Sequence, residues 1–370
     1  MSTHSAQTTT LAERIATLDI LRGFALLGMI IVHFHQRFRL SWPAEDRVGL
    51  PGEWLVGWTA WWGLEQKSWA AFAFLFGVGF AIFMRRAEAH SRPLVTLYLR
   101  RLGVLALIGI AVEALTGFAI LLHYAIWGVP LLFVRRWSTR VLLVLAVISA
   151  MAWPAYRFGV GVHEWLTRDQ AATVAAAPPA VSARAAPPDT YTEVVTRRLG
   201  NIQRGVLSWR VLIPGSSFVL FILGFIALRH GVFDEPKRHL RLIVTAMVVG
   251  LACWLIFWFG LQKMPSAWTD WSDNAWPLRY GLGVISEQWL AFTYMGAIVL
   301  LLAYRPWWTE RLAILGVVGR MALTNYVLQA IAIDLLSSRF GFALKLRPYY
   351  YGASALLLFA ALAVVSYIWL

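Results

Sequence analysis

Repeated apolar runs of about 18 to 22 residues constrain this chain more than any other feature, because runs of that length suit helices that cross a bilayer. Hydrophobic residues make up 59% of the 370 residues and charged residues only 14%. In soluble domains the charged share is about a quarter. The sequence therefore predicts an all-α, polytopic membrane helical bundle.

Ten such runs can be placed along the chain, and we interpret residues 1–370 as a single integral membrane domain. The predicted transmembrane helices cover residues 15–34, 69–84, 102–115, 118–134, 141–156, 211–228, 242–261, 282–303, 312–336 and 351–370. A long connection, 157–209, has an Ala/Pro-rich middle that is typical of extended chain. Its second half has the pattern of an amphipathic surface helix.

Basic residues are unevenly distributed among the connections. The formal net charge is +14, and the short connections after the second, fourth, sixth and eighth runs are dense in arginine. By the positive-inside rule this predicts a multi-pass membrane protein with both termini in the cytoplasm. We expect membrane lipids as partners and no nucleic acid, since the charge is explained by topology.

Several shorter features predict structure. Residues 1–12 are predicted to form a disordered tail, and the first run lacks the pattern of a cleavable signal peptide. The Trp-rich part of 36–67 predicts an interfacial or re-entrant segment. Gly77 and Gly79 predict close helix packing. The single cysteine, Cys253, excludes an internal disulfide, and no metal motif is present.

The first run contains ionisable residues at helical spacing. Asp19 and Arg22 are one turn apart, and His33 follows Arg22 by eleven residues, which is roughly 16 Å along a helix. All three fall on one face, and charges within a membrane span usually pair or face a cavity. We predict catalytic roles in a shared polar chamber. The alternatives are a local ion pair for Asp19 and Arg22, and an interfacial position for His33.

Polar residues also interrupt later runs. Glu113 lies in the third run, His123 and Tyr124 in the fourth, and Glu287 at the start of the eighth. A buried carboxylate must become neutral or find a cationic partner. We therefore predict that these residues bind substrate, with structural pairing across the hairpin of the third and fourth runs as the alternative for Glu113.

The ninth run contains the stretch GRMALTNYVLQ. Four-residue spacing predicts one polar stripe on a single helix, and the stripe consists of Arg320, Thr324, Asn325 and Gln329. Hydrogen bonding between helices is one explanation. Lining a substrate cavity is the other, and we include these residues among the predicted substrate-binding residues.

Three stretches resemble a known family. LDILRGFALLGMIIVH is similar to the opening signature of the YeiB-like family (domain of unknown function 418), FAFLFGVGFAIFMRR to its second-helix signature and GRMALTNYVLQ to its C-terminal signature. The chain departs from the family where His33 replaces a common Asn and Ala119 a common Asp.

The opening stretch also resembles a wider group of membrane acyltransferases, which includes bacterial carbohydrate O-acyltransferases and heparan glucosaminide N-acetyltransferase. Arg22 and His33 match the O-acyltransferase signature of an Arg, ten residues and a His. The resemblance implies acyl transfer from cytoplasmic acyl-CoA, most simply acetyl-CoA, to a hydroxyl or amine of a glycan or lipid-linked acceptor at the outer face.

Two other classes of function fit the same pattern. Ten spans with polar patches are also typical of a transporter or flippase, although no inverted repeat is evident. A non-catalytic membrane scaffold is the third hypothesis. The sequence leaves open whether the chain forms a homo-oligomer.

Overall fold

The computed structural model describes most of the chain. The described residues are 11–39, 52–90, 93–118, 120–174, 190–204, 215–262 and 277–370. Most of the predicted N-terminal tail, the Ala/Pro-rich residues 175–189 and Ala119 lie outside them.

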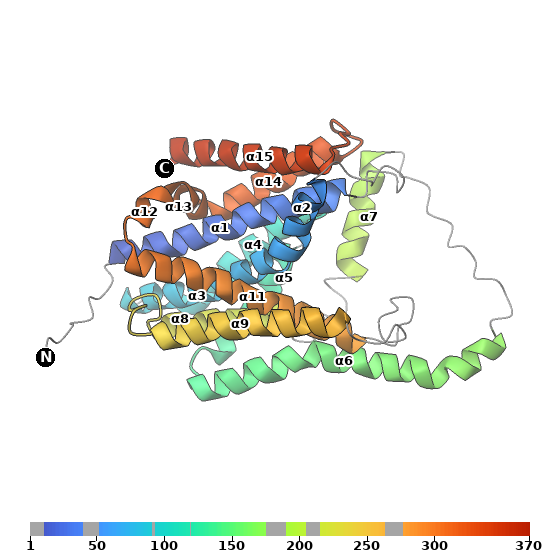
Figure 1. Ribbon diagram of the computed structural model, residues 1–370, viewed down its shortest axis with the longest axis horizontal. Coiled ribbons are helices and arrows are strands. Elements are labelled where there is room, and N and C mark those ends of the chain that lie inside the picture. Colours follow the sequence, from blue (N-terminus) through green and yellow to red (C-terminus); the bar gives the residue numbers. More distant parts are fainter. Residues whose placement is uncertain are drawn as a thin grey trace, which may run out of the picture.

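The described residues form helices and no strand, so the prediction of an all-α bundle is confirmed (Figure 1). The elements are α1 (Leu11–Phe38), α2 (Glu53–Trp58), a π-helix η2 (Thr59–Leu64), α3 (Lys67–Ala89), α4 (Leu94–Thr116), α5 (Ile120–Val134), α6 (Thr139–Val174), α7 (Tyr191–Arg204), α8 (Ser216–Arg229), α9 (Leu240–Gln262), α11 (Pro277–Tyr304), α12 (Trp308–Arg311), α13 (Ala313–Arg320), α14 (Ala322–Ser337) and α15 (Pro348–Trp369).

The ten predicted apolar runs are all helical within the described part of the chain, but their lengths differ. Seven helical segments are long and apolar enough to cross a membrane, and the bent pair α13 and α14 makes an eighth. Helices α5 and α8 have only 15 and 14 residues, about 21–23 Å against a hydrocarbon core of about 30 Å. The prediction of ten spans therefore exceeds the number that length and composition support.

Most of the long helices run roughly along one direction in Figure 1, whereas α7 lies across it. Helix α1 begins and α15 ends at the left of this view, and we call this side the termini end. Helices α2 and α7 lie at the opposite side, which we call the α7 end. Arg22 is therefore toward the termini end of α1, and His33 toward its α7 end.

Helix α1 is the most enclosed of the candidate spans and contacts α3, α11, α13, α14 and α15. Its apolar side chains Leu21, Ala25, Leu26 and Ile30 are fully buried, and even Asp19 and His33 are only 6% and 7% exposed. Helix α9, by contrast, leaves many apolar side chains on the outside of the bundle, such as Val248 and Ile256. The helix with the most ionisable groups is thus the one surrounded by protein.

Two glycines allow α13 to approach α1 at backbone distance. A Cβ added to Gly23 would lie 1.9 Å from the Leu315 carbonyl oxygen, and one added to Gly319 would lie 1.8 Å from the Asp19 carbonyl oxygen. Only hydrogen fits at such contacts, which are typical of small residues between membrane helices. This packing brings Arg320, the last residue of α13, close to the Asp19–Arg22 turn.

The ninth run is not one helix, contrary to the prediction. Helices α13 and α14 meet at an angle of 87° around Met321, so Arg320 ends one helix and Thr324 belongs to the next. The amide nitrogen of Asn325 donates to the Val318 carbonyl at 3.0 Å and to the Ser366 hydroxyl at 2.8 Å. Asn325 thus stabilises the break by bonding a carbonyl near the end of α13. The predicted single stripe is wrong for this reason.

The connection after the fifth run also differs from the prediction. Helix α6 continues to Val174, so the first part of the predicted connection 157–209 is helical. Helix α7 in its second half is amphipathic, with Val194 and Ile202 buried against the bundle. The predicted surface helix is confirmed.

Gly77 and Gly79 have different roles although they lie two residues apart on α3. A Cβ on Gly77 would lie 2.0 Å from the Phe221 carbonyl oxygen, which reflects close packing of α3 on α8. Gly79 has nothing within 4 Å of the same position. The packing role is confirmed for Gly77 and is wrong for Gly79, which faces a cavity.

We expect Gly77→Ala to destabilise the bundle and Gly79→Ala to leave it intact. The first substitution forces α3 and α8 apart, at a cost of about 1–3 kcal/mol. The second adds a methyl group in open space and favours the helix by up to about 1 kcal/mol. Thermal unfolding of the two purified proteins in one detergent measures the difference. Equal melting temperatures would contradict the packing described here.

Candidate functional site

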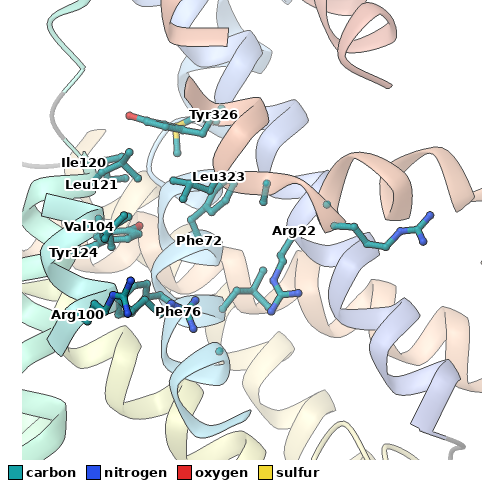
Figure 2. A pocket seen from close by; sticks show the side chains of 18 of the residues that line it. Arg22, Phe72, Phe76, Arg100, Val104, Ile120, Leu121, Tyr124, Leu323 and Tyr326 are labelled. Carbon is teal, nitrogen blue, oxygen red and sulfur yellow. The ribbon is translucent and has the colours of Figure 1, made fainter. Parts of the chain in front are cut away.

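A cavity near the predicted catalytic residues has a volume of about 720 Å³ and is basic at one end. Four arginines line it: Arg22 on α1, Arg100 and Arg101 on α4, and Arg320 on α13. We call it the arginine cavity. Its inner walls are mainly apolar and aromatic, with Phe72, Phe76, Tyr124 and Tyr326. In Figure 2, Arg100 and Tyr326 lie at opposite ends of it.

Arg22 is held at the edge of the arginine cavity by Asp19. The Nη1 atom of Arg22 donates to the Asp19 carboxylate at 2.7 Å, one helical turn away. A smaller cavity of about 220 Å³ adjoins, lined by Arg22, Arg86 and Arg101; Arg22, Gly79 and Arg101 line both cavities. The local ion pair and the cavity-lining role are thus both realised. Such a concentration of guanidinium groups suits an anion, because each can donate two parallel hydrogen bonds.

A second cavity of about 510 Å³ lies farther along α1, and we call it the histidine cavity. His33 and Gln36 of α1, Glu65 and Ser68 beside the start of α3, and His123 of α5 contribute its polar groups. Gln36 donates to the Glu65 carboxylate at 2.8 Å. The sequence-predicted residues His33 and His123 therefore share one cavity.

His33 is packed on several sides. Its ring stacks on Phe118 with centroids 4.1 Å apart and meets the Tyr326 ring edge-on at 6.1 Å. The Gln329 amide nitrogen lies 3.5 Å from its Nδ1 atom. These neighbours fix the ring orientation, so His33 is not an exposed interfacial residue. Gln329, predicted to bind substrate, contacts the predicted catalytic histidine instead.

The two cavities adjoin but are distinct. Among their lining residues, Met29, Ile120 and Tyr326 are common to both. Arg22 and His33 therefore face two neighbouring cavities, and the prediction of a single chamber is wrong. Eleven residues of helix separate the two side chains, which is far enough for the protein to build a partition between them.

The remaining predicted substrate-binding residues lie in different surroundings. Tyr124 lines the arginine cavity and donates to the Trp69 carbonyl at 3.2 Å. Glu113 is 6% exposed, and its Oε2 atom has no hydrogen-bond partner among the described residues. Glu113, Thr324 and Asn325 line neither cavity. Their predicted contact with substrate stays a prediction.

Glu287 has a partner that the sequence did not indicate. Helix α11 begins at Pro277, so Glu287 lies well inside the helix rather than at its start. Its carboxylate is 3.5 Å from the Nζ atom of Lys67, a side chain only 1% exposed. A buried lysine requires such a partner. Lys67 is the first residue of α3 and lies just before an apolar run.

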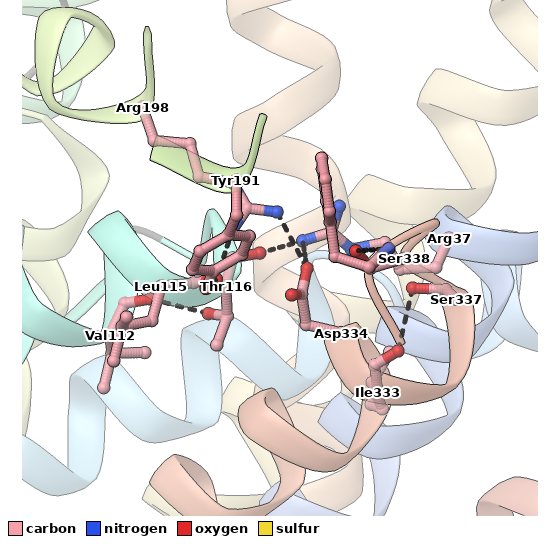
Figure 3. Close-up of polar contacts among 11 residues, drawn as sticks. Arg37, Val112, Leu115, Thr116, Tyr191, Arg198, Ile333, Asp334, Ser337 and Ser338 are labelled. Atoms are coloured by element: carbon pink, nitrogen blue, oxygen red, sulfur yellow. Dashed lines mark hydrogen bonds and ion pairs between the residues drawn. The ribbon is translucent and has the colours of Figure 1, made fainter. Parts of the chain in front are cut away.

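Asp334 forms a further charged cluster at the α7 end of the bundle (Figure 3). Its Oδ1 atom accepts from Arg198 of α7 at 2.8 Å and lies 3.6 Å from Arg37 of α1. Arg198 also donates to the Leu115 carbonyl, and Arg37 to the Thr116 carbonyl. The two arginines thus bond the free carbonyls at the end of α4, where a helix favours positive charge.

This cluster fastens α7 next to the histidine cavity. The Arg37 guanidinium lies 4.6 Å from the centre of the Phe118 ring, which also stacks on His33. Gly117 lines the histidine cavity. A Cβ atom added to it would lie 3.3 Å from the Nε atom of Arg198 and 3.3 Å from the Nη2 atom of Arg37. The cluster joins α1, α4, α7 and α14. No local pattern in the sequence indicates this cluster, because its members lie in four separate segments.

A tryptophan-rich cavity of about 480 Å³ lies on the other side of this end of α1. It is lined by Trp54, Trp58, Trp61 and Trp62 with His35 and Arg39. Arg39 stacks over Trp61 at 4.3 Å, and His35 is 2.9 Å from the Tyr351 hydroxyl. The Trp-rich segment is helical (α2 and η2), and its exposed tryptophans suit the bilayer interface.

The described residues include no group of three or more His, Cys, Asp or Glu side chains that could hold a metal ion.

Comparison with known proteins covers both halves of the chain. Residues 227–370 match the family described as protein of unknown function (DUF418), and residues 14–194 match heparan-alpha-glucosaminide N-acetyltransferase, catalytic. The predicted family resemblance is confirmed. The N-terminal match includes Arg22, His33 and most of the lining of both cavities. This part of the chain is thus similar to the catalytic region of a membrane acetyltransferase.

Two bacterial proteins are similar over most of the chain. "Uncharacterized protein YxaH" of Bacillus subtilis is 28% identical over 99% of this chain and 92% of its own length. The "Uncharacterized 39.9 kDa protein in amylase 3'region" of Bacillus acidopullulyticus is 27% identical over 89% of this chain and 81% of its own length. No solved structure matches the chain.

We expect Asp334→Ala to destabilise the protein strongly. Removing one carboxylate leaves two partly buried arginines unpaired, which costs about 3–5 kcal/mol. Arg197→Ala is the matched control, because Arg197 is exposed on the same helix as Arg198 and such changes stay within about 0.5 kcal/mol. Thermal unfolding in detergent tests both variants. Asp334→Ala melting together with the control would show that the cluster contributes little.

Proposed function

We propose that this multi-pass membrane protein is an acyltransferase that uses acyl-CoA. The observation that carries the proposal is the order of the two cavities along α1: an arginine-lined cavity with an aromatic interior, followed by a cavity with a buried histidine. Both are built largely from the region similar to the catalytic part of an N-acetyltransferase.

The arginine cavity is proposed to bind the donor. CoA has several phosphates and a long, less polar arm that ends in the thioester. Arg22, Arg100, Arg101 and Arg320 would bind phosphate oxygens. The aromatic walls beyond them suit the arm and the acyl group. Asp19 would hold the Arg22 guanidinium in position.

His33 is proposed to act on the acceptor in the histidine cavity. A neutral imidazole takes the proton of an acceptor hydroxyl or amine as the acceptor attacks the thioester carbonyl. The new C–O or C–N bond forms, the C–S bond breaks, and the departing thiolate takes the proton from the imidazolium. In the variant of this mechanism with a covalent intermediate, His33 first accepts the acyl group itself.

The proposed orientation follows the basic connections. In Figure 1 the connections that follow α3, α5, α8 and α11 lie toward the termini end. Arginines at this end, such as Arg86 in the last turn of α3 and Arg136 and Arg305 in the connections, favour the cytoplasmic side of a bacterial inner membrane. The donor cavity then faces the cytoplasm, where CoA is made. The acceptor, a glycan or lipid-linked molecule, would bind at the outer face.

We expect His33→Ala to lower acyl transfer by about 10²–10⁴-fold, the usual range for loss of a general base. The measurement is transfer of labelled acetyl from acetyl-CoA to a membrane extract by purified protein in liposomes. His90→Ala is the control, because His90 is exposed at the end of α3 and bonds only locally, to the Arg86 carbonyl. Equal transfer by the parent and His33→Ala would remove His33 from the mechanism.

We expect Arg22→Ala to raise the KM for acetyl-CoA with a smaller effect on kcat. A charge-assisted hydrogen bond contributes about 1.5–3 kcal/mol, which corresponds to roughly 10–100-fold in affinity. Arg136→Ala, in the exposed connection after α5, controls for general loss of positive charge. The proposed donor site is wrong if both variants keep the parent KM.

A transporter is the second candidate. Two cavities toward opposite ends of the bundle, separated by a narrow boundary, also suit a molecule that crosses the membrane unchanged. The liposome experiment distinguishes the two, because transport moves intact labelled ligand into the lumen and acyl transfer leaves free CoA behind. Release of CoA that depends on His33 favours the enzyme.

A further inference from the structure

Tyr326 occupies the boundary between the two cavities. It lines both of them, together with Met29 of α1 and Ile120 of α5. The side chain of Tyr326 is only 3% exposed, and Met29 is 5% exposed. Figure 2 shows the Tyr326 ring reaching across one end of the arginine cavity toward Ile120. Three side chains from three helices therefore form a constriction.

The Tyr326 ring is held from two directions. Its hydroxyl is hydrogen-bonded to the Ile120 backbone, and its ring meets the imidazole of His33 edge-on at 6.1 Å between centroids. Met29, which also lines both cavities, has an unbranched side chain that adapts its shape readily. The ring can thus give way only by losing its hydrogen bond, whereas Met29 can adjust within the existing packing.

We propose that the acyl group passes from the arginine cavity to His33 through this constriction, and that Tyr326 limits the acyl chain to a short one. The inference rests on the proposed function, because it takes the donor to lie among the arginines and the reaction to occur at His33. A two-carbon acyl group passes beside the ring. A longer chain has to displace the ring from Ile120 and from the contact with His33.

Tyr326 has a steric role that its aromatic neighbours lack. Phe72 is also aromatic but lines only the arginine cavity, and Phe118 lines only the histidine cavity. Truncating either ring enlarges one cavity and leaves the boundary in place. Truncating Tyr326 joins the two cavities, so its effect on chain length differs in kind from a general loss of packing.

The first experiment tests the passage without any enzyme assay. Cys253→Ala first removes the single cysteine of the chain. In that background, Ser68→Cys places one thiol in the histidine cavity. A small anionic methanethiosulfonate is added from the termini end of protein in oriented liposomes. We expect Tyr326→Ala to raise the rate of thiol modification about tenfold or more and Phe72→Ala to leave it near the parent rate. Equal rates for the two variants would overturn the passage.

The second experiment tests chain length with labelled acetyl-, butyryl- and octanoyl-CoA. We expect the parent to prefer acetyl, and Tyr326→Ala to shift the octanoyl-to-acetyl ratio of kcat/KM upward by about tenfold or more, as pockets that discriminate by methylene groups do. Tyr326→Phe, which removes only the hydroxyl, should give a smaller shift in the same direction. An unchanged ratio in Tyr326→Ala would overturn Tyr326 as the limit.

The two experiments separate the possible failures. A parent protein that transfers no acyl group from any donor contradicts the proposed function, and thiol modification then still decides whether the cavities join at Tyr326. Tyr326→Leu, which keeps an apolar side chain in the core, replaces Tyr326→Ala if the latter does not fold. The same increase in modification is expected from it, and its absence counts against the proposal.

Discussion

Enclosure of α1 by the other helices is the condition on which the rest of the structure depends. An ionisable group at the centre of a membrane helix costs about 2.5–3.5 kcal/mol even by the lower scales. Helix α1 includes Asp19, Arg22 and His33 within its apolar span. The bundle reduces that cost by surrounding α1 and by pairing Asp19 with Arg22 at 2.7 Å. The close contacts at Gly23 and Gly319 keep α13 against this turn.

Given that enclosure, the polar side chains of α1 define where cavities can form. Arg22 extends from its ion pair toward the arginines of α4 and α13, and His33 packs between Phe118, Tyr326 and Gln329. The cavities are therefore distributed along one helix rather than gathered in one chamber. Lipid-facing helices such as α9 supply the outer surface and contribute nothing to either cavity.

Periodicity and hydropathy predicted much of the fold because they report properties of single helices. Each apolar run is helical in the described chain, and the amphipathic pattern of residues 191–204 corresponds to α7. The break at Met321 was not predictable in this way, because ALTNYVLQ continues the helical pattern. What bends the chain is the bond from Asn325 to the Val318 carbonyl and the packing of α13 on α1, and neither has a local signal.

The candidate site was predictable only in part for a related reason. Arg22 and His33 could be singled out because charge inside an apolar run is rare, and both line cavities. Arg100 and Arg101 follow a basic connection and resemble ordinary topology signals, yet they complete the arginine cavity. Lys67 and Asp334 gain their meaning from partners on distant helices. Pairwise contacts between segments are not encoded in the spacing of one sequence.

An experimental structure of the protein in a lipid nanodisc with a thioether analogue of acetyl-CoA, which cannot be cleaved, tests the central claim most directly. We predict phosphate density beside Arg22, Arg100, Arg101 and Arg320, with the acyl end at the Met29–Ile120–Tyr326 boundary and directed toward His33. Analogue bound elsewhere, or bound among the arginines with its acyl end directed away from Tyr326, would contradict it.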